Sequence, residues 1–60
     1  MSFQESITVD KIQSILDKVN SDELKDFPLT RGRLMDIVWK LQNGKILSES
    51  DFETLKMNQL

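Results

Sequence analysis

The stretch from residue 34 to residue 52, LMDIVWKLQNGKILSESDF, constrains the fold more than any other part of the chain. Its first apolar residues recur at intervals of three and four, which predicts an amphipathic helix over residues 31–43. Thr30 is the expected N-cap of this helix. Gly44 can adopt the left-handed conformation that commonly ends a helix. The sequence therefore predicts a helix with defined ends in the middle of the chain.

A second helix start follows directly. Ser48 precedes Asp51 by three residues, which resembles a capping box with Asp in place of the usual Glu. We expect a helix over residues 49–58, with Phe52 and Leu55 facing the core. This helix and the one before it would form a C-terminal antiparallel helical hairpin.

The N-terminal half predicts one long and one short helical segment. Residues 9–19 carry a single apolar stripe at helical spacing, with Thr8 as a plausible N-cap. Ser21 can cap a short helical turn at 22–26. Pro28 ends that turn, because the residue before a proline is pushed out of the helical region.

Three apolar residues, Leu24, Phe27 and Leu29, are expected to pack as a plug between the two longer helices. Alternation at period two never persists, so strands are not expected. Residues 1–60 therefore predict one small all-α domain of three helices with a short helical turn.

The composition argues against several classes of function. The chain has 60 residues and neither Cys nor His, so disulfides, zinc sites and the usual bases for a nucleophile are missing. Its two glycines are too few for a glycine-rich phosphate-binding loop. We expect no enzyme, no cofactor and no metal. No apolar run approaches a membrane span and no signal peptide is evident, so a cytoplasmic protein is expected.

The C-terminal half, residues 34–60, resembles the short C-terminal domain (SHOCT) family. The order of matching positions is helix, glycine stop, apolar residue, hydroxyl cap, acid, Phe, Lys and Leu. These positions are Leu41, Gly44, Ile46, Ser48, Asp51, Phe52, Lys56 and Leu60. The resemblance implies a helical hairpin, and it implies oligomerisation as the usual suggested role.

Met35 and Trp39 are the first candidate functional residues. Counted at about 100° per residue, they project roughly 100–140° away from Leu34, so the apolar sector is too wide for a helix packed on one side only. Either another helix of the chain covers this strip, or a second molecule does. Trp and Met suit the second role because they are enriched at interfaces.

The segment Thr30-Arg31-Gly32-Arg33 is the second candidate. Cations in the first turn of a helix oppose its dipole, and glycine there costs helix stability. Free N–H groups beside two guanidinium groups would suit a phosphate or a partner's carboxylate. A solvated basic turn, paired with the acidic first helix, is the alternative.

The residues favour a protein partner or a homo-oligomer over other partners. We expect a small bacterial or phage regulator, adaptor or inhibitor, with Met35 and Trp39 in the contact and Arg31, Arg33 and Lys40 at its rim. A helix-turn-helix DNA-binding regulator is one alternative, although the net charge of -2 opposes it. An acidic DNA mimic that inhibits a nucleic-acid-binding protein is another, with these acids: Asp10, Asp17, Asp22, Glu23 and Asp26.

Overall fold

The structure is a computed structural model that describes the backbone of residues 3–60 and the side chains of residues 9–60. Its elements, in chain order, are α1 (Phe3–Val19), the 3-10 helix η1 (Asp22–Leu24), α2 (Pro28–Gln42) and α3 (Glu49–Met57). No strand occurs over residues 3–60. The prediction of a small all-α domain with three helices and a short helical turn is confirmed.

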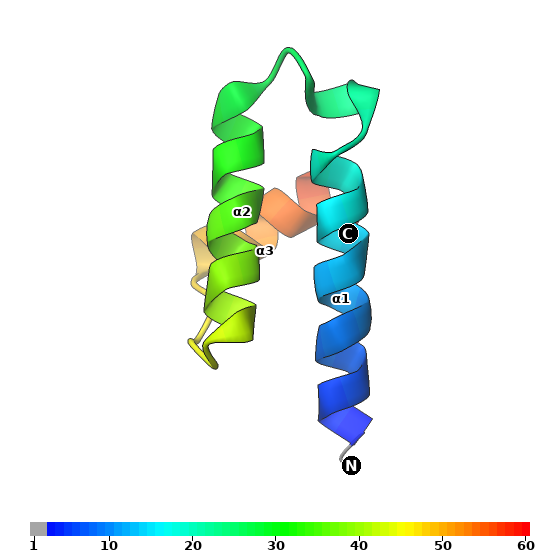
Figure 1. Cartoon of the computed structure of the whole chain (residues 1–60). Helices are drawn as coiled ribbons and strands as arrows, with labels where there is room; N and C mark the ends of the chain where they lie inside the picture. The colour runs from blue at the N-terminus through cyan, green and yellow to red at the C-terminus, as the bar shows by residue number, and fades with distance from the viewer. Residues whose placement is uncertain (1–2) are drawn as a thin grey trace.

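The three helices form two layers. α1 and α2 run side by side in opposite directions, and α3 crosses behind them (Figure 1). Asp51 at the start of α3 contacts Lys40 near the end of α2, whereas Met57 at the end of α3 lines a hollow with Leu29. α2 and α3 therefore form the predicted antiparallel hairpin, although α3 runs obliquely. After α3, the C-terminal segment approaches α1, where the Leu60 carbonyl accepts a hydrogen bond from Lys11.

The core lies where the helices meet. Three side chains have no exposed surface: Ile15 of α1 and Leu34 and Ile37 of α2. The other buried apolar residues are Val19, Leu24, Val38 and Leu55. The apolar spacing of three and four places the core residues of α1 and α2 on the inner faces of these helices, and Leu24 of η1 and Leu55 of α3 complete the core. Burial of apolar surface holds the helices together.

Two helix starts differ from the sequence prediction. α2 begins at Pro28, so Thr30 lies inside the first turn and is not its N-cap. Phe27 occupies the N-cap position without a side-chain cap, and Pro28 suits the first helical position because its φ is already helical. α1 begins at Phe3, so Thr8 is not a cap either, and the side chain of Thr8 lies outside the described residues.

The connection between α1 and α2 contributes less to the core than expected. Ser21 precedes η1 in an extended conformation, but its Oγ donates to the Lys18 carbonyl at 2.6 Å and does not cap η1. Leu24 is buried, whereas Phe27 is 57% and Leu29 81% exposed. The predicted apolar plug is therefore wrong for two of its three residues, because the turn directs only Leu24 between the helices.

Two left-handed residues end the last two helices. Gly44 has the predicted positive φ, +66°, and the N–H groups of Gly44 and Lys45 donate to the carbonyls of Leu41 and Lys40. This pair of hydrogen bonds is a Schellman motif, in which a residue with positive φ satisfies the free carbonyls of the last turn. Gln59, with φ +60°, closes α3 by the same pattern.

Candidate interaction surface

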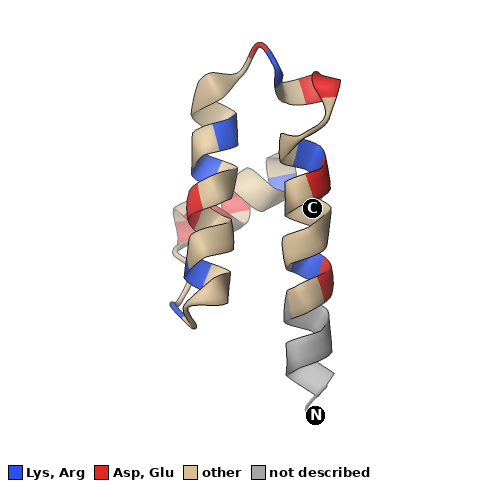
Figure 2. Ribbon diagram, in the orientation of Figure 1, with Lys and Arg blue, Asp and Glu red and all other residues tan. Residues whose placement is uncertain are grey.

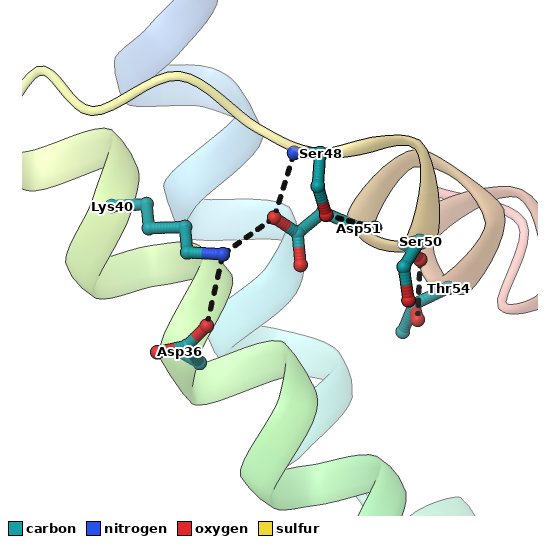
Figure 3. A network of polar contacts seen from close by, with 6 residues as sticks. All are labelled: Asp36, Lys40, Ser48, Ser50, Asp51 and Thr54. Carbon is teal, nitrogen blue, oxygen red and sulfur yellow. Dashed lines mark hydrogen bonds and ion pairs between the residues drawn. The ribbon is translucent and has the colours of Figure 1, made fainter.

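Lys40 is held by two carboxylates at the junction of α2 and α3 (Figure 3). Its Nζ lies 2.7 Å from Asp51 Oδ2 and 3.3 Å from Asp36 Oδ2. The same Asp51 oxygen accepts the Ser48 backbone N–H at 3.0 Å, and Ser48 Oγ accepts the Asp51 N–H at 3.2 Å. The predicted capping box is therefore present, and the contact between Lys40 and Asp36 extends it into a network across two helices.

The network shifts the pKa values of both charged partners. The hydrogen bond from Lys40, supported by the Ser48 N–H, lowers the pKa of Asp51 despite partial burial. The hydrogen bond to Asp51, followed by the contact with Asp36, raises the pKa of Lys40. Lys40 is thus a cation that the fold itself pairs, and the structure does not place it beside the other predicted interaction residues.

Met35 and Trp39 lie on the side of α2 that faces away from α3. The Asp51 contact shows that α3 covers the Lys40 side of α2. At about 100° per residue, Met35 is roughly 140° around the helix from Lys40, and both Met35 and Trp39 are roughly 160° from the buried Ile37. Met35 is 44% and Trp39 53% exposed. No helix covers this strip in the described part of the chain.

α1 contributes apolar residues to the same uncovered side. Lys11 Nζ donates to the Leu60 carbonyl at 3.0 Å, which marks the side of α1 next to the C-terminal segment. Val9 and Leu16 lie roughly 140–160° around the helix from Lys11. Val9 is exposed and Leu16 partly buried.

These residues define one surface, which we call the open face. It consists of Val9, Ile12 and Leu16 on α1 with Met35 and Trp39 on α2. It lies on the side of the α1–α2 pair opposite α3, toward the viewer in Figure 1. Val9, Met35 and Trp39 are its exposed members, whereas Ile12 and Leu16 are partly buried and pack against the core.

One charged residue from the helical parts of residues 9–42 accompanies the open face. Arg31 precedes Met35 by four residues, as Met35 precedes Trp39, so the three side chains form one row along α2. Arg33 lies roughly 160° around the helix from Arg31, on the α3 side. The structure thus brings together Met35, Trp39 and Arg31 of the predicted interaction residues and separates Arg33 and Lys40 from them.

The predicted anion site at the start of α2 lacks the expected geometry. The Arg31 N–H donates to the Phe27 carbonyl at 3.1 Å, so it is part of the helix and not free. Since Arg31 and Arg33 point to different sides of α2, their guanidinium groups do not converge on one ligand.

Phe52 is a predicted core residue that the structure places at the surface, with 59% of the residue exposed. Thr54 and Leu55 take the inward positions of α3, and Thr54 satisfies its hydroxyl by donating to the Ser50 carbonyl at 3.0 Å (Figure 3). Phe52 lies roughly 160° around the helix from Thr54, so the docking angle of α3 turns it outward.

A second group of exposed apolar residues was not identified from the sequence as a surface. Leu29 and Met57 are 81% and 80% exposed and line a shallow hollow with Arg33 between α2 and α3. The sequence did not indicate this group because Leu29 was expected to pack in the core. The hollow is also lined by Thr30, Thr54 and Asn58, so polar groups surround its two apolar residues.

Over the described residues, no helix combines the length and hydropathy needed to cross a bilayer. The same residues contain no cluster of three or more His, Cys, Asp or Glu suited to a metal ion. Comparisons with models of protein families, with curated protein sequences and with solved structures find no match to this chain. The resemblance of residues 34–60 to the SHOCT family therefore stays a prediction.

Proposed function

We propose that the protein is a non-catalytic, cytoplasmic interaction module, a small bacterial or phage regulator, adaptor or inhibitor whose open face is covered by another polypeptide. One observation carries this proposal: Trp39 is 53% exposed beside the 44% exposed Met35, on a helix side that nothing in the described chain covers. Large apolar side chains gathered on one face of a folded domain commonly mark a contact surface.

The composition of the open face supports a protein partner. Interface centres are poor in charged residues and rich in Trp, Met and Arg, which is the combination in the row Arg31, Met35 and Trp39. A buried Trp is among the residues that lose most binding energy when truncated. Covering this row would remove apolar surface from water that the isolated fold leaves exposed.

The charge distribution favours this proposal over a nucleic-acid-binding role. Arg31 and Arg33 point to different sides of α2, and Lys40 is paired with two carboxylates. They do not form the single basic stripe that DNA binding needs. Basic residues are interspersed among the acidic ones on α1 and α2 in Figure 2, which gives little support to an acidic imitation of DNA phosphates.

Site-specific photo-crosslinking in cells that naturally produce the protein tests the proposal. A photoreactive phenylalanine analogue at position 35 places the reactive group on the open face without touching the core. The matched control carries the same group at Glu53, an exposed position on α3. We expect a discrete covalent adduct from position 35 and none of comparable yield from position 53.

The specificity of that adduct is checked with Trp39→Ala in the position 35 variant. Because Trp39 is about half exposed, its truncation should leave the fold intact while it weakens the contact. The proposal would be contradicted if the adduct yields at positions 35 and 53 were equal, or if Trp39→Ala left the yield at position 35 unchanged.

A further inference from the structure

We infer that the hollow between α2 and α3 binds a polypeptide segment in which an acidic residue neighbours a large apolar residue. This site is separate from the open face, because Arg33, which lines the hollow, lies roughly 160° around α2 from Met35. It is therefore independent of the proposed function and gives the module a second contact. With one surface on each side of α2, two polypeptides can be held at once, as an adaptor requires.

The apolar walls of the hollow are more exposed than the open face. Leu29 is 81% and Met57 80% exposed, compared with 53% for Trp39. The two side chains belong to different helices, yet they line one hollow of about 260 Å³. Large apolar groups that converge at one place on a folded domain commonly mark a contact surface.

The charge of the hollow identifies the chemistry of its occupant. Arg33 is the one charged side chain among the residues that line it. Arg33 makes no ion pair within residues 9–60, whereas Lys40 on the same helix is held by two carboxylates. A guanidinium group matches a carboxylate in charge and in shape, because it can donate two parallel N–H groups. An acidic side chain with an apolar neighbour therefore complements Arg33 between Leu29 and Met57.

A second, larger hollow extends the first along the junction of α2 and α3. It measures about 530 Å³ and shares three lining residues with the first: Leu29, Arg33 and Thr54. Gly32 also lines it, and the space above Gly32 is open, since an added Cβ would meet nothing within 4 Å. The two hollows form a groove in which a chain segment can continue past Arg33, so the shape suits a polypeptide.

The far end of this groove fixes where the acidic residue binds. Asp36 and Asp51 line that end, and Lys40 pairs with both. Two carboxylates and one ammonium group leave a net negative charge there, which repels a second acid. The carboxylate of the occupant therefore lies beside Arg33, with its apolar neighbour toward Leu29 and Met57.

Methyl NMR of the whole protein with two blocked dipeptides tests the site. The probes are N-acetyl-Leu-Glu-amide and N-acetyl-Leu-Gln-amide, which have the same size and differ by one charge. The Met57 methyl signal, assigned with Met57→Leu, reports on the hollow, and the Met35 methyl signal reports on the open face. We expect a saturable shift of Met57 with a dissociation constant of about 1–10 mM for the Glu probe, and a much smaller shift of Met35.

A pair of variants tests the role of Arg33. The Glu probe should bind about two- to fivefold more tightly than the Gln probe, as expected for an exposed ion pair. Arg33→Gln should abolish this preference. Lys45→Gln removes the same charge at an exposed position that lines neither hollow, so it should retain the preference.

Three results would overturn the inferred site. They are a Met57 signal that does not shift saturably, equal affinity of the unmodified protein for the two probes, and a preference for the Glu probe that persists in Arg33→Gln. None of them affects the adduct expected from position 35, so the open face would still stand as a contact surface. Conversely, loss of that adduct with an intact Met57 response would contradict the open face alone.

Discussion

Replacing Ser48 by Ala should destabilise the protein through the start of α3. The Ser48 hydroxyl accepts the Asp51 N–H at 3.2 Å, and Ala removes this bond. The reciprocal bond from the Ser48 backbone N–H to Asp51 Oδ2 survives in the variant, since it does not use the Ser48 side chain. Loss of half of the capping box, at an exposed helix end, should cost about 0.5–1 kcal/mol.

This cost is large for so small a domain. A core of this size rarely supplies more than about 3–5 kcal/mol of stability. Since 1 kcal/mol shifts the melting temperature of a domain of 60–100 residues by about 4–8 °C, Ser48→Ala should lower the Tm by roughly 2–8 °C. Thermal unfolding followed by far-ultraviolet circular dichroism, repeated at two protein concentrations to separate any effect of association, measures the change.

Two further variants make the comparison sharper. Ser50→Ala is the matched control, since Ser50 is exposed within α3 and outside the capping box, and its Tm should stay close to that of the unmodified protein. Asp51→Ala should cost more than Ser48→Ala, because it also removes the contact with Lys40. Equal melting temperatures for Ser48→Ala and Ser50→Ala would refute the role assigned to the capping box.

The remaining predictions concern the polar network, the glycines and the core. The pKa of Asp51 is lowered in the folded state, so its stabilising contribution is present above its ordinary pKa of 3.8 and is lost as the pH falls through the folded value. The pKa of Lys40 is raised, so its contribution to stability is complete below its ordinary pKa of 10.5 and is lost as the pH rises through the folded value. Asp51→Asn should therefore flatten both the acidic and the alkaline limb of a curve of stability against pH. Gly32→Ala should stabilise the protein by up to about 1 kcal/mol, because an added Cβ meets nothing within 4 Å, whereas Gly44→Ala should destabilise it by about 1 kcal/mol at φ +66°; melting temperatures that move in the same direction would contradict this pair. Ile37→Val, at a residue with no exposed surface, should cost about 0.5–1.5 kcal/mol in a denaturant titration, and an unchanged midpoint would argue against the assigned core.

The parts of the fold that could be predicted from sequence are those encoded by neighbouring residues. Gly44 and Ser48 act within a few positions of themselves, so the end of α2 and the start of α3 follow from local rules. The start of α2 was misplaced because Thr30 is a common N-cap, whereas Pro28 fills the first helical position without one. The sequence gives no local signal for the left-handed conformation of Gln59, because glycine or asparagine usually occupies such a position and glutamine is a common residue inside helices.

Burial was harder to predict because it depends on how the helices dock. The sequence showed that the apolar sector of α2 is too wide for one neighbour, and Met35 and Trp39 are indeed outside the contact with α3. It did not show that α3 crosses at an angle that turns Phe52 outward. That angle depends on the relative placement of whole helices. The separation of Arg31 and Arg33 around α2, by contrast, follows from the helical period alone and could have been predicted from the sequence.

Trp39 fluorescence tests the central claim most directly, since this residue is the only Trp in the chain. In dilute protein we expect red-shifted emission that a small neutral quencher reduces efficiently, because the indole is about half exposed. As the concentration rises or a partner is added, the emission should shift to the blue and the quenching should decrease. Blue-shifted emission that resists the quencher in the dilute folded monomer, or emission that stays unchanged when the protein assembles, would contradict the assignment of the open face as the contact surface.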